Sequence, residues 1–372
     1  MNWIKKEWHI PEFFDSDMPA TKENWENRRR KEILKLFSEE VYGVTPRRRP
    51  DRAETEVILD NPNDRGGKNH HKRILYHMWF DDRRVSLEID QWTPHGKGPF
   101  PVQMMIDPFE HALFENYTFY DYYQFFPSDF ITDRGYAAVK VNTSTICHDS
   151  KERFYEGILG VLDDDDEGIK EENRWGAIGA WAWAGSRCID YLETQSEMDV
   201  ERIAVSGMSR AGKAALWCGA QEQRIAVVMS NVSGMGGSAI TRGKNGEHIK
   251  DITTAFPFWF SKKFSTYADD EDSLPVDAHM LLAMAAPRPI YMASASFDIW
   301  ADIFAEYKGL YMSAEIYKLY YDGIDLPSEK PENDMPFHIG PIGYHTRTGP
   351  HGLTYYDWQK YLDFCDCYLK IE

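Results

Sequence analysis

Residues 202–213 read Arg-Ile-Ala-Val-Ser-Gly-Met-Ser-Arg-Ala-Gly-Lys, and the helix formers Ala-Ala-Leu-Trp follow directly. An apolar run ahead of a serine and a helical pattern predicts a strand, a tight turn and a helix. At such an elbow Ser209 would hold its hydroxyl clear of the sheet, and the helix N-terminus would offer amide hydrogens to an oxyanion. Gly207 precedes this serine by two residues, but Ala211 stands where a second glycine is usual, so a helix N-cap serine without chemistry is an alternative.

Strand-like and helix-like patterns alternate on both sides of this elbow. The expected strands are Thr55–Leu59, Arg73–Phe80, Val85–Trp92, Val102–Ile106, Ala137–Val141, Arg202–Ser206, Ala226–Ser230, Pro289–Ala295 and Ile316–Tyr320. The expected helices are Lys22–Tyr42, Trp175–Leu192, Ala211–Ala220, Asp302–Met312 and Leu353–Leu369. The first three strands alternate as an antiparallel edge does, whereas the next two are uniformly apolar, as buried parallel strands are. This order predicts an α/β fold, a three-layer sandwich whose mostly parallel central sheet has helices on both faces.

The chain shows no internal repeat and no Gly/Ser-rich or Pro-rich linker. Its 372 residues, 42% of them hydrophobic, are enough for one large domain. We therefore predict a single domain over residues 1–372, with an N-terminal helical extension at about residues 21–45.

The net charge of −18, from 42 basic and 60 acidic residues, argues against a nucleic-acid or anionic-membrane partner, because such surfaces are bound mainly through Lys and Arg. No stretch approaches the roughly 20 apolar residues that span a bilayer, and residues 1–8 carry no apolar run typical of a signal peptide. The sequence as it stands predicts a cytoplasmic protein, or a secreted one if a leader was removed.

No metal or organic cofactor is predicted. The five cysteines are odd in number and lack zinc-ligand spacing, so we interpret them as buried small apolar residues. The acidic run at 163–168 lacks the alternate spacing and the distal glutamate of an EF-hand loop.

Candidate partners for Ser209 follow it in the order Ser, Asp, His that α/β-hydrolases use. Asp298 comes just after the expected strand 289–295, and His351 lies in the loop Arg-Thr-Gly-Pro-His-Gly before the last helix. His345 is a rival base, although its position suggests a structural or substrate-side role, and Asp302 is a less favoured acid. His351 as an ordinary surface histidine also stays open.

The segment Gly-Met-Ser-Arg-Ala-Gly-Lys at 207–213 resembles the Gly-x-Ser-Arg-x-Gly-Lys elbow of the glucuronoyl esterases, carbohydrate esterase family 15. Further segments resemble the bacterial branch of that family: 41–43, 175–181, 230–237, 287–289, 298–302 and 343–345. The resemblance covers nearly the whole chain and implies an α/β-hydrolase fold. It also implies hydrolysis of the ester between 4-O-methyl-glucuronic acid, a side group of xylan, and an alcohol of lignin.

The resemblance implies a role for each matching residue. Ser209 would attack the C6 carbonyl, and His351 would take its proton. Arg210 would neutralise the oxyanion, Lys213 and Glu247 would bind sugar hydroxyls, and Trp300 would pack against the ring, as a polyol requires. The alternatives are a solvated helix face and loop for Lys213 and Glu247, and an ordinary core position for Trp300.

The sequence departs from the family pattern at two positions. Residues 107–111 read Asp-Pro-Phe-Glu-His where many relatives carry a glycine-rich loop, so the second oxyanion donor is unassigned. Val232 stands where fungal members carry the catalytic glutamate.

The implied substrate is a small glucuronate ester or a glucuronoxylan fragment, processed through an acyl-enzyme. The alternatives are another carbohydrate esterase activity, such as deacetylation of xylan, and a glycan-binding protein that has lost turnover. The natural alcohol and the oligomeric state are not predicted.

Overall fold

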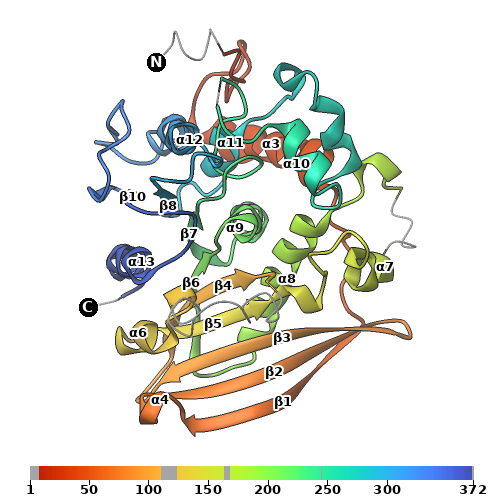
Figure 1. The fold of residues 1–372 in the computed structure, drawn as a ribbon, viewed down its shortest axis with the longest axis vertical. Coiled ribbons are helices and arrows are strands. Elements are labelled where there is room, and N and C mark those ends of the chain that lie inside the picture. Colours follow the sequence, from red (N-terminus) through yellow and green to blue (C-terminus); the bar gives the residue numbers. More distant parts are fainter. Residues whose placement is uncertain (1–7, 110–123, 163–167, 244, 371–372) are drawn as a thin grey trace.

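The computed structural model describes residues 8–109, 124–162, 168–243 and 245–370 (Figure 1). Within these ranges one sheet of ten strands has the order β1-β2-β3-β5-β4-β6-β7-β8-β10-β9. The strands are β1 (Arg52–Asn63), β2 (Asn69–Phe80), β3 (Arg83–Pro94), β4 (Phe100–Asp107), β5 (Ala137–Asn142), β6 (Met198–Ser206), β7 (Ile225–Asn231), β8 (Ile290–Ala295), β9 (Phe337–Ile339) and β10 (Ile342–Arg347). The strands from β5 to β10 in this order run parallel, while β1, β2 and β3 extend the sheet antiparallel at one edge and β9 pairs antiparallel with β10 at the other.

Helices lie on both faces of this sheet. The described helices are α2 (Lys22–Asn24), α3 (Arg30–Phe37), α4 (Asp64–Gly67), α6 (Ser128–Asp133), α7 (Ile158–Leu162), α8 (Ala177–Leu192), α9 (Arg210–Gln221), α10 (Ile249–Ala255), α11 (Ala278–Ala283), α12 (Ile303–Tyr317) and α13 (Tyr355–Leu369), of which α4 is the short link between β1 and β2. Figure 1 shows α8 and α9 on one side of the sheet and α6 and α13 on the other.

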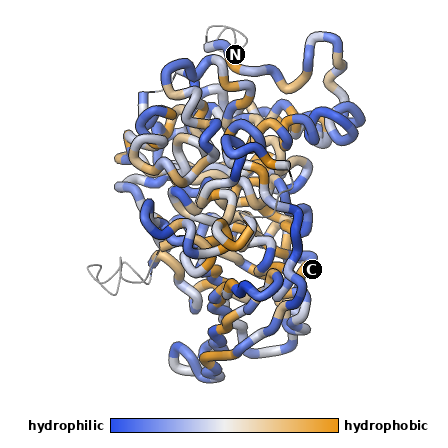
Figure 2. The backbone as a smooth tube through the Cα atoms, turned by 90° about the vertical axis from the view of Figure 1, so that its right-hand side faces the viewer, coloured by the Kyte–Doolittle hydropathy of each residue, from blue (hydrophilic) through white to orange (hydrophobic). Residues whose placement is uncertain are grey.

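Two apolar cores occupy the two faces. Met104 and Met105 of β4 are both fully buried, yet they belong to different apolar clusters, because successive side chains of a strand point to opposite faces. The cluster of Met104 includes residues of α8, α9 and α12, and the cluster of Met105 includes residues of α13. Apolar residues accordingly gather in the interior of the molecule (Figure 2). The predicted α/β three-layer sandwich with a mostly parallel sheet is confirmed.

One expected strand is wrong. Residues 316–320 do not form a strand, since α12 continues to Tyr317 and turns follow it. The amide of Lys318 still donates to the carbonyl of Ala314, and that of Tyr320 to Tyr317. The apolar residues here face the core from a helix, and a short apolar run does not distinguish the two structures. After Asp298 the chain instead forms two strands that were not expected, β9 and β10, and β10 pairs with β8.

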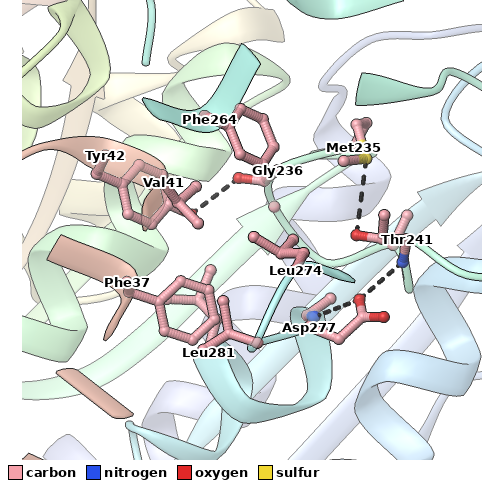
Figure 3. A pocket seen from close by; sticks show the side chains of 14 residues that line it. Phe37, Val41, Tyr42, Met235, Gly236, Thr241, Phe264, Leu274, Asp277 and Leu281 are labelled. Carbon is pink, nitrogen blue, oxygen red and sulfur yellow. Dashed lines mark hydrogen bonds between the residues drawn. The ribbon is translucent and has the colours of Figure 1, made fainter. Parts of the chain in front are cut away.

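The expected helix at 22–42 is observed as α2 and α3 joined and continued by π-helical turns. It packs against α9, where the ring of Tyr42 stacks on Trp217 at 4.6 Å between centroids. Beneath it, residues of this segment and of 235–281 line a cavity of about 20 Å³ (Figure 3). That volume holds about one water molecule, so this cavity is no sugar site.

Four of the five cysteines are buried, as expected, but Cys367 is exposed on α13 and corrects that interpretation. The acidic run at 163–167 lies outside the described residues. Among the helices that the structure describes, none combines the length and apolar character needed to cross a membrane.

Candidate active site

The carboxyl ends of four adjacent parallel strands carry the candidate residues. β6 leads to Ser209, β7 to Val232, β8 to Asp298 and β10 to His351. Parallel strands end at one edge of a sheet, and α/β folds bind their ligands there. The fold therefore brings residues distant in sequence to one edge.

Ser209 lies on a strained turn between β6 and α9. Its backbone has φ 59° and ψ −123°, a combination that costs a non-glycine residue on the order of 1–3 kcal/mol. Two backbone bonds to β7 hold the turn, from Ser209 N to the Asn231 carbonyl at 2.8 Å and from Asn231 N to the Gly207 carbonyl at 3.0 Å. The Ser209 hydroxyl makes no N-cap bond to α9, which speaks against the capping alternative.

Close packing explains the glycines of the elbow. A Cβ atom at Gly207 would lie 2.2 Å from the carbonyl oxygen of Ala211, and one at Gly212 would lie 2.8 Å from the hydroxyl oxygen of Ser230. The second glycine is therefore needed one position later than the usual pattern, where α9 touches β7. Ala211 itself is fully buried.

His351 and Asp298 meet across the edge between β8 and β10. The Nδ1 atom of His351 lies 2.5 Å from an Asp298 carboxylate oxygen, and the other Asp298 oxygen accepts from Ala301 N at 3.2 Å. Asp298 is 7% exposed, whereas the His351 side chain is 45% exposed. With Nδ1 bound to the carboxylate, Nε2 is the nitrogen left for a serine hydroxyl, which is the arrangement a general base needs.

The two rival residues have structural roles. Asp302 caps α12 through Ala305 N at 3.1 Å, and its other oxygen accepts from Asn245 N at 2.7 Å. His345 is fully buried and bonds to Asp357 at 2.9 Å and to the Tyr291 hydroxyl at 3.0 Å. Neither bonds to His351.

The residue at the end of β7 is a buried valine with φ 42°, a conformation that β-branched residues rarely adopt. Val232 donates its amide to the Ala293 carbonyl at 2.8 Å. Its side chain offers no acceptor to a histidine, so Asp298 is the carboxylate that meets His351.

Arg210 is held in an aromatic cage. Its guanidinium lies 4.5 Å from the centre of the Trp259 ring and 5.2 Å from that of Phe256, and it forms an ion pair with Asp149. The indole nitrogen of Trp259 donates to the other Asp149 oxygen at 2.8 Å. Sequence reasoning missed Asp149 and Trp259; the position of Asp149 soon after the expected strand 137–141 was the available signal.

Lys213 is buried, so its alternative position on a solvated helix face is wrong. Its ammonium donates to the Ser233 carbonyl at 2.5 Å. Burial lowers the pKa of Lys213 to about 8, an effect that the nearby Glu247 carboxylate opposes and Arg210 reinforces. A buried ammonium with donors to spare can bind an oxygen-rich ligand.

Glu247 and Trp300 hold each other at the rim. The indole nitrogen of Trp300 donates to the Glu247 carboxylate at 3.1 Å, and Glu247 N donates to the Trp300 carbonyl at 2.9 Å. Trp300 is 56% exposed, so its alternative role as a core residue is wrong. Asp302 helps to set this pair, since its carboxylate binds the amides of residues 245 and 246.

Another buried carboxylate, Glu306 of α12, was also missed. It accepts from Gly234 N at 2.9 Å, Ser238 at 2.8 Å and Ser294 at 2.7 Å. Burial raises the pKa of Glu306 to about 7, which these hydrogen bonds only partly offset. The second oxyanion donor stays unassigned, because residues 110–111 lie outside the described residues.

The chain is similar to known proteins in sequence and in structure. A family model described as "Glucuronyl esterase, fungi" matches residues 167–320. The chain is 40% identical over 213 residues to a protein named "Carbohydrate esterase MZ0003" from an unknown prokaryotic organism, a match that covers 57% of this chain and 49% of that protein. It is 40% identical over 127 residues to a 4-O-methyl-glucuronoyl methylesterase of Podospora anserina, covering 32% of this chain and 26% of the relative. The matches thus span half or less of these curated relatives.

A solved structure is similar over almost its full length. The glucuronoyl esterase from Solibacter usitatus superposes with a TM-score of 0.85 and 30% sequence identity, covering 96% of this chain and 97% of that one. The fold, the motif around Ser209 and the sequence similarity all indicate the same family. The chain belongs to the glucuronoyl esterases of carbohydrate esterase family 15.

Proposed function

We propose that this protein is a serine carboxylester hydrolase that cleaves esters of glucuronic acid or its 4-O-methyl ether, using Ser209, His351 and Asp298. The single observation that carries the proposal is the 2.5 Å contact between His351 Nδ1 and the Asp298 carboxylate, at the same sheet edge as the strained Ser209 turn. The name of the family and of the curated relatives supplies the substrate class.

The proposed reaction has two steps. His351 Nε2 takes the hydroxyl proton of Ser209 as the oxygen attacks the C6 ester carbonyl, and the Asp298 carboxylate stabilises the imidazolium. The imidazolium then gives its proton to the leaving alcohol, and an acyl-enzyme forms. Water activated by His351 releases glucuronate and restores Ser209.

The oxyanion would be stabilised from α9. Arg210 is the first residue of this helix, where backbone amides have no intrahelical acceptor. Its guanidinium adds a fixed positive charge, because Asp149 and the aromatic cage hold it in one place. A preorganised donor costs no rearrangement when charge develops.

Three groups are suited to the sugar. Lys213 offers a buried donor, Glu247 offers an acceptor, and Trp300 offers a flat exposed ring beside Glu247. Paired donors and acceptors beside an aromatic wall are what a neutral polyol requires.

The surface beside the acid favours an apolar alcohol. Phe297, Ile299 and Phe304 are 67%, 84% and 63% exposed, and they lie within the same short segment as Asp298 and Trp300. Large apolar side chains that are exposed close to a site in the chain can contact a ligand bound there. An aromatic alcohol, of the kind that lignin supplies, fits this surface better than methanol does.

A substrate panel tests the proposal. We expect hydrolysis of benzyl glucuronate with a kcat/KM well above that for methyl glucuronate and for acetylated xylan. A preference for acetylated xylan would establish the deacetylase alternative, and binding of glucuronate without turnover of any ester would establish a glycan-binding protein.

A further inference from the structure

The loop that carries His351 is tied down by the residue that ends β10. The guanidinium of Arg347 donates to the Pro350 carbonyl at 2.9 Å and to the Gly352 carbonyl at 3.0 Å, on both sides of His351. Gly349 has φ +144°, and a Cβ atom there would lie 2.4 Å from a guanidinium nitrogen. Three backbone units of this loop therefore lie against one side chain.

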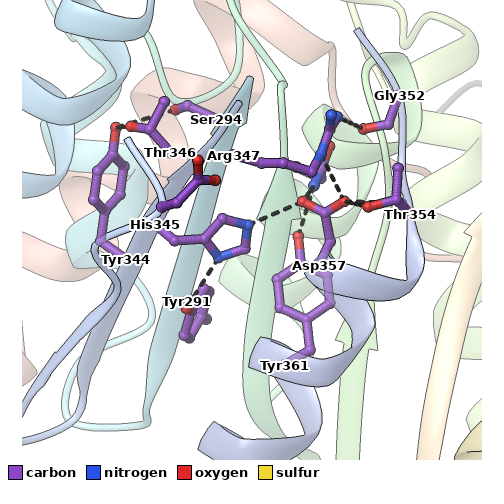
Figure 4. Close-up of polar contacts among 12 residues, drawn as sticks. Tyr291, Ser294, Tyr344, His345, Thr346, Arg347, Gly352, Thr354, Asp357 and Tyr361 are labelled. Carbon is purple, nitrogen blue, oxygen red and sulfur yellow. Dashed lines mark hydrogen bonds and ion pairs between the residues drawn. The ribbon is translucent and has the colours of Figure 1, made fainter. Parts of the chain in front are cut away.

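Arg347 is in turn fixed by a fully buried carboxylate of α13. Its Nε donates to Asp357 at 3.0 Å, and the same carboxylate oxygen caps the start of α13 through Thr354 N at 2.8 Å (Figure 4). The other Asp357 oxygen accepts from His345 at 2.9 Å. Burial alone would raise the pKa of Asp357, but the hydrogen bonds and charges of His345 and Arg347 bring it below its usual value. Arg347 and Asp357 thus form an ionised pair, and hydrogen bonds from several elements fix its geometry.

The same carboxylate reaches the nucleophile elbow. The side-chain amide of Asn231 donates to Asp357 at 3.2 Å and to the Tyr361 hydroxyl at 3.1 Å. The backbone of Asn231 makes the two bonds that hold the turn around Ser209. A continuous set of buried polar contacts therefore connects the backbone at Ser209 with the backbone on both sides of His351.

We propose that Arg347, oriented by Asp357, is a positioning residue that fixes the position of the His351 loop relative to Ser209. The inference rests on the proposed function, because it needs His351 to be the base. Arg347 touches no reacting atom. It acts by holding the carbonyls next to the base, and a displacement of about 1 Å at a catalytic group can cost on the order of 10²-fold in rate.

The test measures kcat and KM of Arg347→Gln for benzyl glucuronate and for p-nitrophenyl acetate. We expect kcat to fall about 10²-fold on both esters, while KM stays within about threefold of the parent value. The reason is that the variant misplaces the base His351 and leaves the sugar contacts intact. Guanidinium chloride at a non-denaturing concentration should restore part of kcat, because the free cation can occupy the vacated place between the carbonyls and Asp357.

Arg288→Gln is the matched control. Arg288 also bridges backbone carbonyls, those of Gly219, Glu222 and Ile225, but it precedes β8 and so lies at the opposite end of the strands. We expect this variant to unfold at a lower temperature while its folded fraction keeps the kcat of the parent, with no recovery by guanidinium. An equal loss of kcat in both variants would overturn the positioning role.

Arg347→Lys replaces Arg347→Gln in this test if the glutamine variant does not fold. It keeps a cation beside Asp357 but lacks the planar fork that reaches two carbonyls, and we expect an approximately tenfold lower kcat with unchanged KM. A kcat within threefold of the parent in a folded Arg347 variant overturns the proposal. Should the Arg347 variants keep the activity of the parent, Ser209→Ala distinguishes a failure of this inference from a failure of the proposed function. An active Ser209→Ala enzyme contradicts the proposed function as well, whereas an inactive one contradicts only the role of Arg347.

Discussion

The elbow around Ser209 and the loops that carry Asp298 and His351 meet at one sheet edge but are held by different means. The elbow is fixed by backbone bonds to β7 and by glycines that leave no space. The facing loops are more open: the His351 side chain is 45% exposed, and Ile299, next to Asp298, is 84% exposed. Arg347 and the buried carboxylate of Asp357 hold the His351 loop, and the buried carboxylate of Glu306 binds Ser294 of β8.

Those two carboxylates differ in turn. Asp357 has a cationic partner and a lowered pKa, whereas Glu306 accepts hydrogen bonds from the uncharged donors Gly234 N, Ser238 and Ser294 and has a pKa raised to about 7. Local backbone geometry is thus enough to present a nucleophile, while a base on an open loop needs side-chain anchors from other elements.

The largest effect is expected from the elbow itself. Ser209→Ala should lower kcat by at least about 10⁴-fold on every ester, because no neighbouring group can replace its oxygen. Ser206→Ala is the matched control, since that hydroxyl donates to the Met104 carbonyl within the sheet. Initial rates of the two purified variants, with unfolding temperatures close to the parent, check this; an active Ser209→Ala enzyme would remove the serine mechanism.

The next effect concerns the facing loops. Asp298→Asn should cost on the order of 10³ to 10⁴ in kcat, because an amide cannot stabilise the imidazolium or fix its tautomer. Asp302→Asn should cost much less, since Asp302 binds only backbone amides. An Asp298→Asn enzyme within about tenfold of the parent would contradict the assignment. Recovery of activity in a Val232→Glu, Asp298→Asn double variant would show that a carboxylate at the end of β7 can also accept the hydrogen bond from His351.

A smaller effect should separate substrate binding from chemistry. Lys213→Met and Trp300→Ala should lower kcat/KM for benzyl glucuronate about 10- to 100-fold and that for p-nitrophenyl acetate by less than about threefold, because only the sugar uses these contacts. Equal losses on both esters would indicate a structural role and favour the deacetylase alternative.

Lys213→Met should also raise the unfolding temperature at pH 7. The folded protein releases the Lys213 proton near pH 8, whereas the unfolded chain keeps it to about 10.5. The charged form is therefore disfavoured by folding, and the stability of the parent should rise between pH 8 and 10.5, by up to on the order of 3 kcal/mol. Thermal unfolding at several pH values checks the sign, and a parent whose stability does not rise relative to Lys213→Met in this range would contradict it.

A second effect on stability, opposite in its pH trend to that of Lys213→Met, is expected from Glu306→Gln. The pKa of Glu306 is raised from 4.5 to about 7 in the folded protein, so its contribution to stability is present below pH 4.5 and is lost as the pH rises through 7. The unfolding temperature of the parent, relative to the variant, should therefore fall by a few degrees between pH 5 and pH 8. Glu315→Gln, on the exposed side of the same helix, is the matched control; an identical pH trend in both variants would contradict the assignment to Glu306.

The sequence by itself determined the alternation of strands and helices through the centre of the chain and the identity of the elbow. Hydrophobic period and the glycines around Ser209 are local properties, so they predicted β6, α9 and the parallel sheet without any long-range contact. The same local reading failed at 316–320, because a short apolar run is compatible with the end of α12 and with a strand.

Only the tertiary structure decided which residues meet. The sequence favours Asp298 as the acid but does not exclude Asp302. The register of β8 against β10 brings Asp298 to His351 and turns Asp302 toward the amides of 245–246. The burial of Lys213, the cage around Arg210 and the anchors Glu306 and Asp357 were likewise invisible, because each depends on a partner from another element. Local pattern sets what a segment becomes, while the pairing of strand ends sets which side chains share a site, and no short window of sequence contains that information.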